Sequence, residues 1–370
     1  MEPEHRPLRR GWTTGACATA AAKAAYAALL GQGFPDPVEI ALPGGARVAF
    51  ALAEAARDGD AAIVGVVKDA GDDPDVTHGA LIRVAVRLRP PGCGIVFRAG
   101  EGVGTVTRPG LPIPPGEPAI NPVPRQMIAA ALAEIGPGDA EVTIGVEHGQ
   151  ALALQTLNGR LGIVGGLSIL GTTGVVIPYS CAAWIDTIHR GIDVAIACGL
   201  DHIAGSTGST SEKAVQALHG MPETALIEMG DFAGGMLKYL RRHPVPRVTV
   251  AGGVAKMTKL AQGRLDLHSK RGEADLAALA RCAAETGADA ALQERIAGAN
   301  TVAEAFAHAA AAGLPLGDAV AALAWRTAAE ALRPAPVALE IVLFDRTGAL
   351  AGRAAFAPVH AASPPRNRRR

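Results

Sequence analysis

The distribution of apolar and charged positions divides the chain at one long uncharged stretch. Residues 161–185, LGIVGGLSILGTTGVVIPYSCAAWI, carry no charge, and on hydropathy alone they are long enough to span a bilayer. Five glycines and Pro178 interrupt any helix through this stretch, and non-helical backbone cannot satisfy its polar groups in lipid. The stretch is therefore predicted to be the hinge of a soluble protein, made of buried strand, loop and the start of a helix at Pro178.

The segments before this hinge predict an α+β domain over residues 1–190 with an antiparallel or mixed sheet. Short β-rich runs are separated by turn signals such as Pro43-Gly44-Gly45. An alanine-rich helix is predicted over 16–30, and a second begins at Pro122 with Asn121 as its N-cap. The predicted strands cover 38–42, 47–52, 61–68, 80–89 and 141–146.

After the hinge the pattern changes to strand, glycine loop and helix in repetition, which predicts an α/β domain over residues 191–350. Four strands joined by helical crossovers form a parallel sheet with right-handed connections. Because ligands bind at the carboxyl ends of such strands, loops 199–210, 228–235 and 252–259 are expected to form one binding edge. The predicted strands are 193–199, 225–229, 247–251 and 337–344, and a C-terminal tail is expected over 351–370.

Charge and cysteine content narrow the class of protein. The 35 basic residues balance the 35 acidic ones, which argues against a general nucleic-acid or membrane surface. The five cysteines are scattered and lack any C-x-x-C spacing, so neither a disulfide framework nor a zinc site is expected. The first residues are charged and lack the apolar core of a signal peptide, so a cytoplasmic location is predicted.

The expected binding edge is rich in glycine, serine and threonine and carries acids and lysines. This chemistry suits a small polar or nucleoside-like ligand, with an acid on a ribose and a lysine near an anion. The alternative is that the glycines only allow tight turns. The expected cofactor-binding residues are Gly205, Ser206, Thr207, Gly208, Ser209, Glu228 and Asp231.

Two loops of the first domain carry further candidate chemistry. Two arginines and two threonines precede the first helix, where free N–H groups can hold a carboxylate or phosphate; a simple threonine cap with solvated arginines is the alternative. Loop 68–79 contains four carboxylates, for which structural capping is favoured over a metal ion. Residues 100–104 contain spaced glycines, but no helix follows them, so a strand-turn-strand element is predicted instead of a nucleotide-binding loop.

No Walker motif, nucleophile elbow or H-E-x-x-H motif is present. Several long irregular strings nevertheless resemble the CbiD family, the cobalt-precorrin-5B (C-1)-methyltransferases of oxygen-independent cobalamin biosynthesis. These strings are RGWTTGACATAAAKAA (10–25), KDAGDDPDVTHG (68–79), GEGVGTVTRPG (100–110), INPVPR (120–125), SILGTTG (168–174), EMGDF (228–232) and KLAQGRLDLHS (259–269).

The resemblance implies a two-part fold and methyl transfer from S-adenosylmethionine to ring carbon C-1 of cobalt-precorrin-5B, which gives cobalt-precorrin-6A. It implies no protein-bound metal, and transient contact with neighbouring pathway enzymes is expected. Attack on a sulfonium methyl group needs in-line positioning more than a strong base, so catalytic residues stay unassigned. The substrate's carboxylates are expected to meet Arg10, Thr13, Thr14, Arg125, Thr172, Thr173, Lys256 and Lys259.

Two other functions remain as alternatives. A small-molecule kinase-like enzyme would use Gly171-Thr172-Thr173-Gly174 to hold phosphate, although the accompanying Lys/Ser pair and metal ligands are missing. A non-catalytic tetrapyrrole carrier would leave the glycine-rich edge of the second domain without a purpose.

Overall fold

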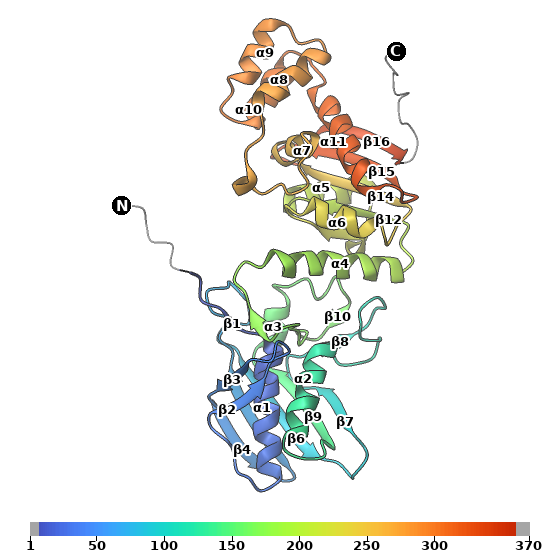
Figure 1. The fold of residues 1–370 in the computed structure, drawn as a ribbon. Helices are drawn as coiled ribbons and strands as arrows, with labels where there is room; N and C mark the ends of the chain where they lie inside the picture. The colour runs from blue at the N-terminus through green and yellow to red at the C-terminus, as the bar shows by residue number, and fades with distance from the viewer. Residues whose placement is uncertain (1–6, 360–370) are drawn as a thin grey trace, which may run out of the picture. The chain divides into compact units, whose positions relative to one another are not determined.

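The structure, a computed structural model, describes residues 7–359 and divides the chain into two units between Cys181 and Ala182 (Figure 1). The sequence placed this boundary at residue 190, which lies inside a continuous helix, α4 (Cys181–Ala197). Within the described residues no helix is long and apolar enough to cross a membrane.

The first unit is built on a mixed five-stranded sheet. Its strand order is β4-β5-β6-β9-β7; neighbours are antiparallel except β7 and β9, which are parallel. The strands of this unit are β1 (Gly11–Trp12), β2 (Val38–Ala41), β3 (Arg47–Phe50), β4 (Glu54–Asp58), β5 (Ala61–Val67), β6 (Leu81–Leu88), β7 (Ile95–Ala99), β8 (Thr105–Val106), β9 (Ala140–Val146), β10 (Ile163–Val164) and β11 (Val175–Val176). Its helices are α1 (Thr14–Leu29), α2 (Pro122–Ala133) and α3 (Gly149–Ala153).

The core of the first unit lies between this sheet and helix α1. Alternate residues of β9 are buried, and those of β5 and β6 on the same face pack against α1, as period-two alternation requires. Helix α1 also contacts α2, and its alanines allow both neighbours to approach closely, so its residues are buried through Ala28. Pro122 begins α2 as predicted; Asn121 is the N-cap residue, although its side-chain amide donates to the Ile169 carbonyl oxygen and does not cap the helix.

The second unit is built on another five-stranded sheet, with order β13-β12-β14-β15-β16. The first four strands are parallel and β16 pairs antiparallel with β15. The strands are β12 (His202–Ser206), β13 (Leu226–Glu228), β14 (Arg247–Gly253), β15 (Ala338–Phe344) and β16 (Leu350–Pro358). Besides α4, the α-helices are α5 (Ser209–His219), α6 (Ala233–Leu240), α7 (Val254–Ala261), α8 (Leu276–Glu285), α9 (Ala290–Ala297), α10 (Val302–Ala311) and α11 (Leu316–Leu332), and two 3₁₀ turns are η1 (Glu223–Ala225) and η2 (Ser269–Arg271).

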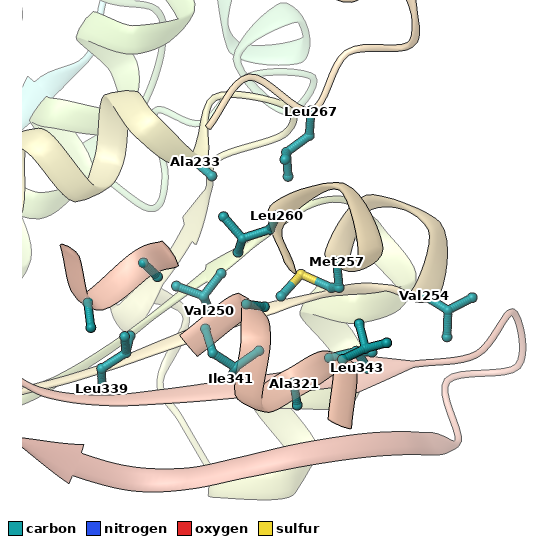
Figure 2. Packing of buried hydrophobic residues seen from close by; sticks show 14 of the residues in the cluster. Ala233, Val250, Val254, Met257, Leu260, Leu267, Ala321, Leu339, Ile341 and Leu343 are labelled. Carbon is teal, nitrogen blue, oxygen red and sulfur yellow. The ribbon is translucent and has the colours of Figure 1, made fainter. Parts of the chain in front are cut away.

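Both faces of this second sheet are covered by helices. Figure 2 shows Met257 and Leu260 of α7 packed over Val250 of β14 and Ile341 of β15, in the core that also receives α6 and α11. Alternate strand residues such as Ala204 face the opposite way and pack with α5. Burial on both faces explains why these strands are nearly continuous apolar runs.

The predicted strand over 193–199 is wrong, because these residues form the end of α4 and the loop after it. Ile188, Ile192 and Ala195 are buried at helical spacing, so a short apolar run that fitted either element belongs to a helix. The first strand of the sheet is instead β12, within the predicted loop 199–210. The sheet also gains the antiparallel strand β16, so it is not the purely parallel four-stranded sheet that was predicted.

Two further expectations need correction. The tail predicted from residue 351 begins too early, because β16 pairs with β15 and Val359 donates a backbone hydrogen bond to Val337. The hinge stretch 161–185 is only partly buried: Val164, Leu170 and Ile177 are more than half exposed. They lie in loops and two-residue strands that do not have a packed layer over them on both sides.

Candidate functional site

At the carboxyl ends of the parallel strands in the second unit, the connections that follow two neighbouring strands leave to opposite faces of the sheet. Strand β12 leads into α5 on one face of the sheet, whereas the adjacent β14 leads into α7 on the other face. Such a point, where neighbouring connections leave to opposite faces, opens a crevice between the two strand ends and is where open α/β sheets bind ligands. We call the loops at this edge, residues 205–209, 228–232 and 252–256, the rim.

The first rim loop is shaped by glycines. A Cβ atom on Gly205 would lie 2.2 Å from the Met236 sulfur, so β12 packs closely on α6 and a side chain there would have to displace that methionine. Gly208 is the N-cap residue of α5, and no side chain caps that helix. The first N–H groups of α5 therefore lack a capping side chain, and such helix starts can bind a phosphate or carboxylate.

Ser206 is the least expected residue of this loop. Its side chain is 0% exposed, and its Oγ atom has no hydrogen-bond partner among residues 7–359. Strand alternation directs it to the face of Ala204, which packs with α5, so it lies beneath the start of that helix. A buried hydroxyl without a partner is costly, which indicates a place where a ligand supplies the missing bond.

Glu228 lies beside Ser206. It is the last residue of β13 and pairs with Ser206 in register, so both side chains leave the sheet on the same face. It follows Gly208 by 20 residues. An acid at the end of the second strand, about 20 residues after the glycine turn, is the position that binds ribose hydroxyls in dinucleotide-binding folds.

Asp231 and Lys256 connect all three rim loops. The Lys256 Nζ atom lies 3.0 Å from Asp231 Oδ1 and donates a hydrogen bond of 2.9 Å to the Thr207 carbonyl oxygen. Thr207 in turn donates its backbone N–H to Ala251 at 3.0 Å. The structure thus places all seven cofactor-binding residues predicted from the sequence in the rim, namely Gly205, Ser206, Thr207, Gly208, Ser209, Glu228 and Asp231.

Lys259 is also in α7 but has a different environment. It is 9% exposed, and its Nζ donates to the Leu267 carbonyl oxygen at 3.1 Å. Leu267 donates its own N–H to the Asp231 carbonyl oxygen. Lys259 therefore fixes the segment around Leu267 against Asp231, and contact with a substrate would require release of this hydrogen bond.

In the first unit the predicted residues gather at the start of α1. Thr13 accepts a hydrogen bond from Ala16 N and caps the helix, as the alternative interpretation predicted. Gly171 packs directly on the Thr13 side chain, which brings the loop with Thr172 and Thr173 next to this helix end. Thr172, Thr173 and Arg10 are exposed there, while Thr13 and Thr14 are buried.

The acidic loop 68–79 holds this arrangement in place, which is the structural role favoured from the sequence. Asp69 forms a bidentate pair with Arg9, and Asp73 accepts a hydrogen bond from Tyr179 N at 2.8 Å. The hydrogen bonds from Arg9 and from Gly71 N lower the pKa of Asp69 to about 2. Among residues 7–359 no group of three or more metal-ligating side chains lies close enough to hold a metal ion.

Arg125, in the first turn of α2, is engaged by groups near it in the first unit. Its guanidinium donates to the Ile120 carbonyl oxygen at 2.8 Å and to Glu117 at 3.2 Å, and it lies over the ring of Phe97. Its side chain is 28% exposed and lines a pocket of about 430 Å³. These contacts give Arg125 a structural role and leave part of its side chain open to solvent.

Sequence reasoning missed one buried polar cluster in the second unit. Glu340 is 0% exposed and accepts hydrogen bonds from Thr249, His219 and Arg353. His202 extends the cluster by a 2.8 Å contact with Thr249. The signal was present, since Glu340 interrupts an otherwise apolar strand.

Comparison with known proteins identifies relatives over the whole chain. Residues 1–178 match the family model CbiD, and residues 266–355 match the model of the CbiD C-terminal domain. The chain is 63% identical to the cobalt-precorrin-5B C(1)-methyltransferase of Agrobacterium fabrum, over 100% of both chains, and 62% identical to that of Halorhodospira halophila, over 95% of both. A crystal structure of the cobalamin biosynthesis protein CbiD from Archaeoglobus fulgidus is 25% identical over 71% of this chain and 83% of that chain, with a TM-score of 0.38.

Proposed function

The chain belongs to the CbiD family, and from this membership we propose that it methylates ring carbon C-1 of cobalt-precorrin-5B to give cobalt-precorrin-6A. The observation that carries the proposal is the near-complete alignment, at 62–63% identity, with relatives that bear this activity in their names. The alignment covers all of this chain, and so both of its units.

We propose S-adenosylmethionine as the methyl donor and the rim as its site. Three properties of the rim fit a nucleoside: the glycine turn at 205–208, the unpartnered hydroxyl of Ser206, and the acid at the end of β13. We place the ribose on Glu228 in preference to Asp231, because Asp231 already pairs with Lys256. Gly208 and Ser209 offer backbone N–H groups beside it, whereas the Thr207 N–H is already bonded to Ala251.

The residues of the rim would act by positioning. When bound, S-adenosylmethionine supplies an electrophilic methyl group, and its transfer to carbon requires alignment of donor and acceptor more than a proton-transferring side chain. A donor held at ribose and amino-acid ends has few remaining orientations. Binding and exclusion of water are therefore the tasks we assign to the rim side chains.

We propose the start of α1 as a site for substrate carboxylates. Arg10, Thr172 and Thr173 are exposed there next to the capped helix end formed by Thr13 and Thr14. A positive side chain beside a helix N-terminus favours a carboxylate. Arg125 and Lys259 remain weaker candidates, since both donate to backbone carbonyl groups. A cytoplasmic location and transient contacts with enzymes that supply the substrate also belong to this proposal.

A thermal-shift comparison separates this function from a phosphate-binding enzyme and from a carrier. S-adenosylhomocysteine should raise the unfolding temperature, because a ligand at a hundredfold excess over its Kd stabilises the folded state by about 2.7 kcal/mol. The cobalt corrinoid should do so as well, and ATP should not. Stabilisation by ATP alone would support the kinase-like alternative, and stabilisation by the corrinoid alone would support the carrier.

A further inference from the structure

We infer that the Asp231–Lys256 pair recognises the amino-acid end of the methyl donor, with the ligand's ammonium group on Asp231 and its carboxylate on Lys256. This inference rests on the proposed function. An α-amino acid carries an ammonium group and a carboxylate on the same carbon atom, and the rim presents a carboxylate and an ammonium group in contact with each other. Each ligand group can take the place of one member of the pair.

Asp231 has an unused bonding capacity. Its Oδ1 atom is buried and makes no hydrogen bond of acceptable geometry, although Lys256 Nζ lies 3.0 Å away. Its backbone carbonyl is held by Leu267 N, so the residue is fixed where it lies. The ion pair with Lys256 thus leaves this oxygen without a well-aligned donor, and a ligand ammonium group has three N–H donors that could supply one.

Lys256 can change partner without leaving the rim. Its side chain is 37% exposed, so the ammonium group is accessible, and the Thr207 carbonyl oxygen holds it at the end of β12. It lies in the first turn of α7, whose N-cap residue is Gly253 and which has no side-chain cap. A carboxylate next to Lys256 would also meet the free N–H groups of this turn.

The arrangement of the acids fixes which end of the donor lies here. Glu228, at the end of β13 on the face of Ser206, has the position of a ribose-binding acid, whereas Asp231 reaches Lys256 beyond the end of β12. The rim loop 228–232 carries two carboxylates, which repel a polyphosphate and favour a ligand with positive groups. S-adenosylmethionine has two such groups, the sulfonium and the ammonium.

Calorimetric titration with two nucleosides tests the assignment. S-adenosylhomocysteine carries the amino-acid group, and 5′-methylthioadenosine has the same nucleoside and thioether without it. Asp231→Asn and Lys256→Met should each weaken S-adenosylhomocysteine binding about tenfold or more, the effect of losing one charged hydrogen bond, and should leave 5′-methylthioadenosine nearly unchanged. Glu228→Gln should weaken both nucleosides, and Asp201→Asn, which removes an ion pair with Arg247 at the opposite end of the strands, should weaken neither.

The ligand series also tests the inference without any substitution. The wild-type protein should bind the deaminated and the decarboxylated analogues of S-adenosylhomocysteine about tenfold or more weakly than the parent. In the Asp231→Asn protein, the deaminated analogue should bind no more weakly than S-adenosylhomocysteine itself. In the Lys256→Met protein, the same should hold for the decarboxylated analogue. Equal weakening of both nucleosides by Asp231→Asn, or no weakening of either, would overturn the inference alone. A wild-type protein that binds neither nucleoside would overturn the proposed function and this inference with it.

Discussion

Removal of the Glu340 carboxylate should destabilise the second unit without touching the rim. Glu340 is fully buried and is the common acceptor for His219, Thr249 and Arg353, with a distance of 2.8 Å to the Arg353 Nε atom. Deletion of one member of a buried ion pair costs about 3–5 kcal/mol, because the other charge is left unpaired. The Arg353 side chain is 39% exposed and can regain water, so we expect Glu340→Ala to cost about 3 kcal/mol, the lower end of that range.

Urea unfolding followed by tryptophan fluorescence measures this cost. In a Trp12→Phe background the remaining tryptophans, Trp184 and Trp325, both lie in the second unit, so the signal reports that unit alone. Asp266→Ala is the matched control, because it removes an exposed ion pair and should cost no more than about 1 kcal/mol. A Glu340→Ala protein whose free energy of unfolding matches this control would refute the energetic role assigned to the cluster.

Three further substitutions test other parts of the structure. Burial and the neighbouring His219 lower the pKa of His202 from 6.5 to about 4. The unfolded chain therefore binds more protons than the folded one between these pH values, and the second unit should lose about 1–2 kcal/mol of stability as pH falls from about 6.5 towards 4, after allowance for the partial exposure of His202. The substitution His202→Asn should abolish this loss, as measured by urea titrations at several pH values. Gly11→Ala should lower the calorimetric unfolding temperature of the first unit by the equivalent of about 1–3 kcal/mol, since its Cβ would lie 2.0 Å from the backbone of Ala70; an unchanged temperature would contradict this close approach. Arg125→Ala should lower thermal stability and affect both ligands alike, whereas a stable variant with a KM for the tetrapyrrole raised about tenfold would favour a direct substrate contact.

Local sequence patterns predicted those helices and strands whose pattern of apolar residues or turn residues fits a single type of element. Burial alternates along β6 and β9 because only one face of the sheet packs on α1. Helix α2 begins where Pro122 fixes the backbone and lacks an N–H to satisfy. The pattern of residues 193–199 fits two elements, since a short apolar run suits a buried strand as well as the last turns of α4. Only packing against the core decides between them.

The sequence predicted which loops meet at the candidate site, but not which side chains in them contact one another. Glycine-rich turns after buried strands placed Glu228 and Asp231 at one edge of the sheet. That Lys256 reaches both Asp231 and Thr207 depends on the order of β13, β12 and β14, which no local pattern contains. Arg125 shows the same limit, because an arginine at a helix start can bind a carboxylate only as far as the chain's own carbonyl groups leave it free, and here the Ile120 carbonyl oxygen accepts a hydrogen bond from it.

Transfer of a labelled methyl group tests the central claim most directly. The purified protein is incubated with cobalt-precorrin-5B and S-adenosylmethionine that carries ¹³C in its sulfonium methyl group, and the product is examined by carbon NMR and mass spectrometry. The account predicts one labelled methyl group, attached to ring carbon C-1, together with release of S-adenosylhomocysteine. Glu228→Gln should form this product more slowly at low donor concentration. A folded protein that binds both compounds but leaves the macrocycle unlabelled, or that labels a different ring carbon, would contradict the account.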